Sequence, residues 1–259
     1  MTIYLFGDSF VENEPANALN VKDHKRWYDY VGESCNEKVI NFGKCGTGQI
    51  YSMNKFLDLY EKGKFKCNDK FVFMLSSPYR IPWQWKNENG KSIDDSTIYQ
   101  SYFWKNDFNF SDDQKYCLNQ IYHVFLDEFA RTTIKNIYLL KSLSLQNKFN
   151  IIVFSIYHTN SNPYGKKYNT KIYDISSIND EKFYYYPVPL FEHSKKEWKT
   201  DRSKIDEGMI NHFSEKNHII LSNIIINHFL KTKLPTIFYE KFIVGINYDQ
   251  NRLKDFIYE

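Results

Sequence analysis

The sequence predicts an α/β fold, a three-layer sandwich in which helices flank a central, mainly parallel β-sheet. Short apolar segments alternate with segments of helical periodicity along the 259 residues, which is the pattern of repeated βαβ units. Two segments, Lys70–Leu75 and Asn150–Tyr157, are as rich in apolar residues as strands covered on both faces. Neither an internal repeat nor a Gly/Ser-rich linker divides the chain, so we expect a single domain over residues 1–259.

The first predicted strand, Thr2–Phe6, ends in a Gly-Asp-Ser turn. A strand that stops there puts the Ser9 hydroxyl at the carboxyl edge of the sheet, where ligands bind in open α/β folds. Backbone N–H groups at the start of a following helix would stabilise negative charge beside the serine oxygen. Ser9 is therefore a candidate site residue, and the alternative is an ordinary turn serine.

The next two elements are a helix and a strand that leads into a glycine-rich turn. Trp27 and Val31 lie on one helix face, where Trp27 is expected to be a core anchor, and Gly32 suits the helix end. The second strand, Lys38–Phe42, precedes the turn Gly43–Gly48 and a helix over about 50–60. This arrangement leaves backbone N–H groups bare at the sheet edge. The turn lacks the Gly-Lys-Ser/Thr ending of a phosphate-binding loop, and a purely structural turn is the other alternative.

The third strand ends in a polar stretch at the same edge. Ser77 and Arg80 are candidate donors there, and a guanidinium also suits an anionic substrate, whereas an ordinary surface arginine is the alternative. Residues 81–112 lose periodicity and contain many aromatics, among them Trp83 and Trp85. We expect an insertion that packs over the edge as a lid or a sugar-stacking surface. The alternative is a self-packed mini-core without substrate contact.

The second half of the chain begins with a long amphipathic helix from Asp112 or Asp113, with a candidate break near Thr132. His158 follows the strand Asn150–Tyr157 at the same edge of the sheet. It is one of two candidate catalytic histidines, and the other, His212, lies near the end of the chain. Residues 159–205 are expected to form an irregular loop region beside the cleft.

The last informative stretch places His212 just before a final helix with Ser214 as its N-cap. Asp206 and Glu207 precede it, and either carboxylate would orient the imidazole if the loop bulges. Otherwise a backbone carbonyl would hold the ring, or His212 is a loop histidine without a partner. His218 is expected to be structural.

These segments resemble the sequence blocks of the SGNH (GDSL-type) hydrolases. The resemblance rests on the Gly-Asp-Ser turn at Ser9, the Asn-x-Gly-x-x-Gly turn ending at Gly46 and the His-x-Ser helix start at His212. Two positions depart from the family pattern, because Pro78 stands where block three has Asn and Met209 stands where block five has Asp. The first departure implies a slower enzyme or a substitute donor, since one oxyanion donor contributes on the order of 3 kcal/mol.

The resemblance implies an SGNH/flavodoxin-like architecture in which Ser9 attacks an ester carbonyl with His212 as general base. Asp206 is the candidate orienting acid, and the oxyanion would be held by Ser9, Gly46 and Ser77. Carbohydrate O-acetyl esters are the expected substrates, and the expected substrate contacts are Arg80, Trp83 and Trp85. The alternative is a catalytically degenerate protein that binds glycan or a protein partner. Nucleotide or phosphate binding at the glycine turn is a third alternative.

Composition narrows the remaining function classes. The net charge of +3 is too small and dispersed to indicate nucleic-acid binding, and the four cysteines form no metal-type pattern, so we expect neither a metal nor a cofactor. No apolar run reaches the roughly 18 residues that span a bilayer. The first strand begins at residue 2, which predicts a cytoplasmic protein without a signal peptide, or one carried in a virion. No pattern indicates an oligomeric state.

Overall fold

The computed structural model describes residues 1–12, 25–44, 47–76, 80–86, 92–98, 111–156, 176–186, 190, 213 and 215–231. The strands of the main sheet are β1 (Thr2–Phe6), β2 (Lys38–Asn41), β3 (Lys70–Leu75), β6 (Asn150–Ser155) and β7 (Phe183–Tyr186). Two further strands, β4 (Ile81–Lys86) and β5 (Ser92–Ile98), form a separate antiparallel pair. The helices are α1 (Trp27–Cys35), α2 (Gln49–Glu61), α4 (Asp112–Asn147), α6 (Glu215–Phe229) and the short 3-10 helix η1 (Ser176–Ile178).

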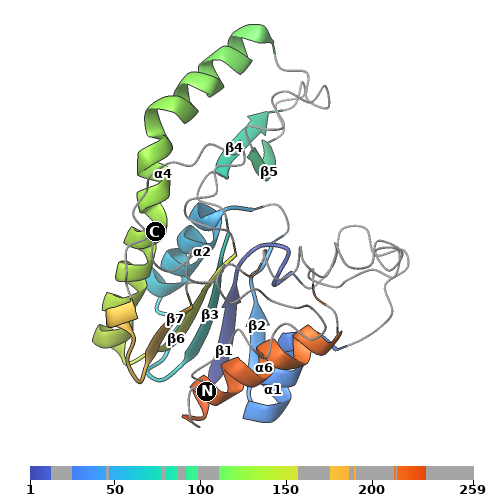
Figure 1. The fold of residues 1–259 in the computed structure, drawn as a ribbon, viewed down its shortest axis with the longest axis vertical. Helices are drawn as coiled ribbons and strands as arrows, with labels where there is room; N and C mark the ends of the chain where they lie inside the picture. Colours follow the sequence, from blue (N-terminus) through green and yellow to red (C-terminus); the bar gives the residue numbers. More distant parts are fainter. Residues whose placement is uncertain are drawn as a thin grey trace, which may run out of the picture.

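The main sheet has five strands in the order β2-β1-β3-β6-β7, and every neighbouring pair is parallel (Figure 1). The predicted α/β class is therefore confirmed, and the sheet is parallel throughout. The chain builds outward from β1 to β2 and then returns to the other side of β1 with β3. The order thus reverses between β1 and β3, which is the switch point where open α/β sheets bind ligands.

Helices cover both faces of the sheet, so the strands contribute to two separate cores. Ile3 and Leu5 pack in the core beneath α1 and α6, whereas Tyr4 and Phe6 pack in the core beneath α2 and α4. This alternation follows from the two-residue repeat of a strand. Both faces are apolar in β1, β3 and β6, which explains why the central strands read as continuous apolar runs.

Aromatic side chains fill much of the second core. Phe6 stacks on Phe73 with ring centroids 5.0 Å apart, and Phe56 meets Phe73 edge-on at 5.2 Å. Phe71 packs against Phe149 in the same cluster. Part of the high aromatic content of the sequence is therefore core packing rather than a binding surface.

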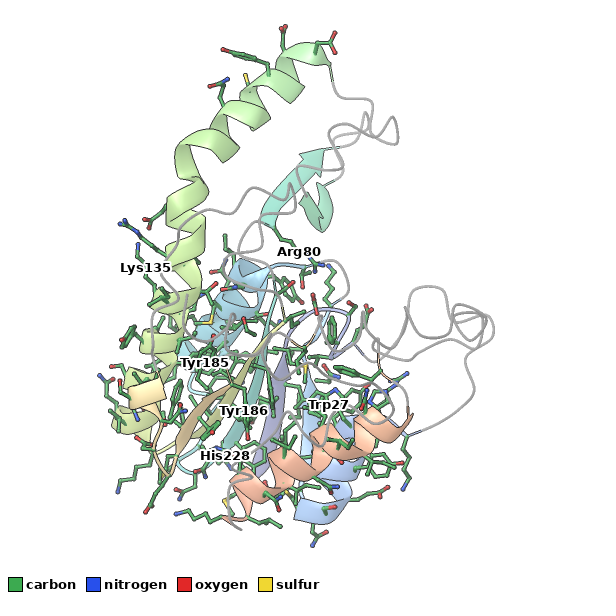
Figure 2. All side chains as sticks on the ribbon, viewed as in Figure 1. Trp27, Arg80, Lys135, Tyr185, Tyr186 and His228 are labelled. Carbon is green, nitrogen blue, oxygen red and sulfur yellow. The ribbon has the colours of Figure 1, made fainter. Side chains whose placement is uncertain are left out.

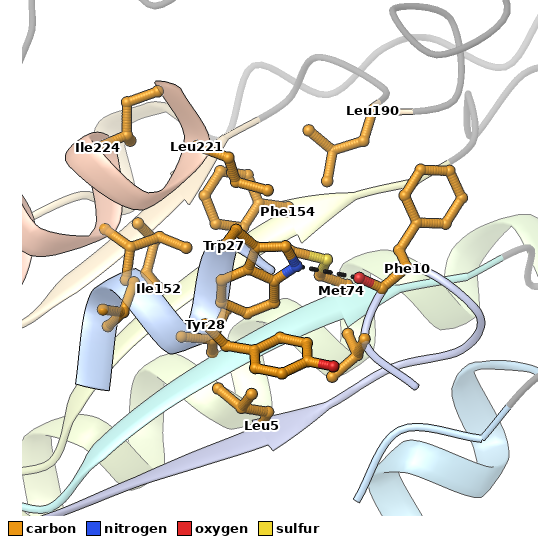
Figure 3. Packing of buried hydrophobic residues seen from close by; sticks show 14 of the residues in the cluster. Leu5, Phe10, Trp27, Tyr28, Met74, Ile152, Phe154, Leu190, Leu221 and Ile224 are labelled. Atoms are coloured by element: carbon orange, nitrogen blue, oxygen red, sulfur yellow. Dashed lines mark hydrogen bonds between the residues drawn. The ribbon is translucent and has the colours of Figure 1, made fainter. Parts of the chain in front are cut away.

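Trp27 anchors the other core, as predicted. The side chain is fully buried, and its indole Nε1–H donates a hydrogen bond to the Phe10 carbonyl at 3.0 Å (Figure 3). The Trp27 backbone N–H donates to Nδ1 of His218, which is also fully buried. His218 is thus structural, as expected, and it ties the start of α1 to α6.

Four local expectations were wrong. Residues 81–98 are not simply irregular, because they include the β4–β5 pair, and the stretch 159–205 contains η1 and the fifth strand, β7. The long helix α4 continues through Thr132, whose hydroxyl donates to the Glu128 carbonyl one turn back.

The fourth concerns Gly32, which lies within α1 rather than at its end. A Cβ at Gly32 would come within 2.8 Å of the Val39 side chain, so the glycine permits close packing of α1 on β2. The helix ends at Asn36, which takes the left-handed conformation with φ of 51°.

Candidate functional site

The candidate site lies where the chain leaves β1, at the carboxyl edge and next to the switch point. The Asp8 carbonyl accepts hydrogen bonds from Val11 N at 2.9 Å and from Glu12 N at 3.1 Å, which closes a tight turn. Ser9 is half-buried within this turn. A Cβ on Gly7 would come within 2.5 Å of the Val11 side chain, so any other residue would displace Val11 where the strand enters the turn.

The Asp8 side chain is the centre of a buried polar cluster beneath the turn. Its Oδ1 accepts a hydrogen bond from Phe10 N at 3.1 Å, which is the pattern of an Asx turn. Its Oδ2 accepts from the Ser76 hydroxyl at 2.7 Å and from Arg80 Nη1 at 2.8 Å. The carboxylate is completely buried, and charge-assisted bonds of this kind offset the desolvation of a buried anion.

Arg80 is not a surface arginine, because only 6% of the residue is exposed. Besides Asp8, its Nη1 donates to the Thr47 carbonyl at 2.8 Å, just before the start of α2. Figure 2 shows Arg80 at the carboxyl end of the sheet. The guanidinium thus bonds two neighbouring loops, which favours a role in building the site.

The loop after β2 is fastened to the turn at Ser9. Asn41 donates from Nδ2 to the Val11 carbonyl at 2.5 Å and accepts at Oδ1 from Gly43 N at 2.7 Å. The Lys44 N–H donates to the Gly7 carbonyl at 3.1 Å. The Asn and the first Gly of the Asn-x-Gly-x-x-Gly turn therefore hold the two loops together.

A second polar network attaches the start of α2 to the neighbouring elements. Gln49 Nε2 donates to the Ser76 carbonyl at 2.6 Å and to the Thr133 hydroxyl at 2.8 Å, and Asn136 Nδ2 donates to Gln49 Oε1 at 3.1 Å. The candidate break in α4 is thus a place where a buried threonine accepts a hydrogen bond from α2.

The chain next to His212 approaches the same turn. Phe213 is fully buried, and its ring lies edge-on to the ring of Phe10 at a centroid distance of 5.2 Å. Phe213 also contacts the ring of His218. Residues adjacent in the chain to Ser9 and His212 therefore pack against each other.

Tyr28 supports the turn from the side of α1. Its hydroxyl donates to the Glu12 carbonyl at 3.2 Å and accepts from Arg26 Nη1 at 2.8 Å. Burial raises the pKa of Tyr28 to about 12, so the phenol remains protonated and continues to donate at neutral pH.

Several predicted site residues lie outside the described residues, namely Gly46, Ser77, His158, Asp206, Glu207 and His212. Trp83 and Trp85 belong to β4, and the pairing register with β5 shifts between them. Sequence reasoning assigned no role to Asp8, Asn41 or Thr47. Asp8 and Asn41 stand within the Gly-Asp-Ser and Asn-x-Gly-x-x-Gly motifs, but nothing in the sequence showed which groups they bond.

Within the described parts of the chain, no group of three or more His, Cys, Asp or Glu residues is placed to ligate a metal. None of the described helices has the length and apolar composition needed to cross a bilayer. In comparisons with known proteins, no family model and no curated protein matches the chain. The SGNH resemblance therefore remains a prediction that rests on the residues themselves.

Proposed function

We propose that the protein is a serine hydrolase that cleaves ester bonds, with Ser9 as nucleophile and His212 as general base. One observation carries this proposal. Ser9 sits directly after the first strand, beside the switch point, in a turn that Asp8 fixes through four hydrogen bonds to backbone and side-chain groups of Phe10, Val11, Glu12 and Ser76. A nucleophile on such a rigid turn loses little orientational freedom when it reacts, which is a large part of catalysis by proximity.

The contact between Phe10 and Phe213 supports the pairing of Ser9 with His212. Each phenylalanine is the chain neighbour of one of the two proposed catalytic residues, and consecutive Cα atoms are about 3.8 Å apart. The buried His218–Trp27 bond holds the start of α6 in the same region. General-base catalysis requires the imidazole to come within about 3 Å of the hydroxyl in the reactive complex.

The proposed reaction has two steps. Ser9 Oγ attacks the ester carbonyl carbon, His212 accepts the hydroxyl proton, and the tetrahedral intermediate collapses when His212 returns that proton to the leaving alcohol. Water then attacks the acyl-serine in the same way, and the acid is released. Backbone N–H groups of Ser9 and Gly46, together with Ser77, would stabilise the oxyanion, and Asp206 would orient the imidazole.

Carbohydrate O-acetyl esters are the proposed substrates. The support is the position of Trp83 and Trp85 on β4, which follows directly from the loop that carries Arg80, and the contact of β4 with α2. Aromatic rings are suited to stacking on sugar faces. An acetylated glycan should therefore release acetate faster than an aryl acetate of equal concentration.

The test is hydrolysis of an aryl acetate together with labelling by a fluorophosphonate probe. Ser9→Ala and His212→Ala should each lower kcat by at least about 1,000-fold. Ser142→Ala, on the exposed face of α4, is the matched control and should retain full activity. Unchanged turnover in Ser9→Ala would reject the proposal, and a wild-type protein that neither turns over ester nor labels would be the degenerate glycan- or protein-binding alternative.

A further inference from the structure

We infer that Arg80 is a positioning residue of the proposed esterase site, whose guanidinium fixes the three strand-end loops relative to one another. The inference rests on the proposed function for its catalytic consequence. Its structural basis is separate, because the contacts of Arg80 involve the loops after β1, β2 and β3.

The three loops meet at this one side chain. Arg80 belongs to the loop after β3, its Nη1 bonds Asp8 Oδ2 in the loop after β1, and the same Nη1 bonds the Thr47 carbonyl in the loop after β2. The backbone also fits closely, because a Cβ on Gly48 would come within 2.5 Å of the Arg80 carbonyl oxygen. A shift of Arg80 must therefore move or release both neighbouring loops.

The polar cluster at Arg80 includes Asp8, Thr47 and Ser76, and each of these residues is next in the chain to a predicted oxyanion donor. Asp8 precedes Ser9. Thr47 follows Gly46, and Ser76, whose hydroxyl shares Asp8 Oδ2 with the guanidinium, precedes Ser77. Donors to an oxyanion act only when their positions are fixed to within about 0.5 Å, and Arg80 links all three of the segments that carry them.

The chemistry of the side chain suits this task. A guanidinium is planar, permanently charged and rich in N–H donors, so one group can bond a carboxylate and a carbonyl at once. Lysine supplies the charge but lacks that fixed fork of donors. The positioning role therefore predicts different outcomes for Arg80→Lys and Arg80→Met.

The chain provides a matched control at the other end of β3. Lys70 forms a 2.5 Å ion pair with Glu37, and the side chains are 5% and 8% exposed. The corresponding values for Arg80 and Asp8 are 8% and 0%. Lys70→Met thus removes a buried cation of similar environment without touching the carboxyl-edge loops.

The experiment compares Arg80→Met, Arg80→Lys and Lys70→Met in the full chain with an aryl acetate. Arg80→Met should lower kcat by about 100-fold or more with KM changed by less than about threefold, because the loss affects the transition state. Arg80→Lys should recover part of kcat. Lys70→Met should lower the urea midpoint but leave kcat within about twofold of wild type.

Hydrogen–deuterium exchange supplies a readout that does not depend on activity. Peptides covering residues 7–12 and 47–53 should exchange faster together in Arg80→Met and remain at the wild-type rate in Lys70→Met. If Arg80→Met does not fold, the same comparison is made with Arg80→Lys. Wild-type kcat and wild-type exchange in the folded Arg80 variant would overturn the inference.

The two proposals fail in different ways. A wild-type protein that neither hydrolyses esters nor labels at Ser9 would overturn the esterase proposal. The exchange measurement would still test whether Arg80 fixes the three loops. An active wild-type protein with an unaffected Arg80 variant would overturn the positioning role of Arg80 and would leave the esterase proposal unchanged.

Discussion

His228 makes the stability of the fold depend on pH in a defined range. The residue is 4% exposed in α6, at the end of the sheet opposite Arg80 (Figure 2), and its Nε2 has no hydrogen-bond partner among the described residues. Its ring lies 6.0 Å from that of Tyr184. Burial, partly offset by a hydrogen bond to the Ile151 backbone and by Asp180, lowers the pKa of His228 from 6.5 to about 4.

The magnitude follows from proton linkage. Between pH 6.5 and pH 4 the unfolded chain binds a proton at His228 that the folded chain does not, so the free energy of unfolding falls as the pH falls. The loss is negligible above pH 7, amounts to about 2 kcal/mol at pH 5 and approaches about 3 kcal/mol below pH 4. That is a substantial part of the 5–15 kcal/mol typical of a folded domain.

Urea denaturation at pH 7.5, 6 and 5, for the wild type and His228→Gln, isolates this contribution. Carboxylates titrate alike in both proteins, so they cancel in the difference between the two unfolding free energies. We expect wild type to lose about 2 kcal/mol relative to His228→Gln between pH 7.5 and 5. A difference that is the same at all three pH values would show that the imidazole of the folded protein is not held in its neutral form.

Three further predictions concern the supports of the candidate site. Trp27→Phe removes the donor to the Phe10 carbonyl and should lower the free energy of unfolding by about 1–3 kcal/mol in urea denaturation, whereas an unchanged midpoint would show that this bond contributes nothing. Gly7→Ala should lower the free energy of unfolding by about 1–3 kcal/mol, measured by thermal melting, because the new Cβ meets the Val11 side chain at 2.5 Å, and an unchanged melting temperature would show that Val11 moves aside at no cost. Phe213→Ala removes the ring that packs on Phe10 and should cost about 3–5 kcal/mol; full ester turnover in the folded variant would separate this contact from catalysis.

Local sequence patterns were sufficient for the elements that bury large apolar surfaces. β1, β3 and β6 are continuous apolar runs, and the helix face of Trp27 and Val31 has the spacing of a buried stripe. β7 escaped notice because four residues in a polar, tyrosine-rich stretch become a strand only by pairing with the exposed edge of β6. β5 was missed for a similar reason, since its sequence Ser-Ile-Asp-Asp-Ser-Thr-Ile is mostly polar and its conformation depends on pairing with β4.

In the candidate site, too, some features follow from the local sequence and others depend on tertiary contacts. The position of Ser9 after the first strand could be read from the chain, because a strand must end where a glycine and two short polar residues follow it. The partners of Asp8 could not, since Ser76 and Arg80 lie 68 and 72 positions away and become neighbours only when β1 and β3 pair. Sequence alone thus determined the class of fold and the edge at which to look, because both depend on local hydrophobic patterns. Only the tertiary structure decided which charge Asp8 meets, because a buried carboxylate is stabilised by whichever donors the packing of distant strands brings to it.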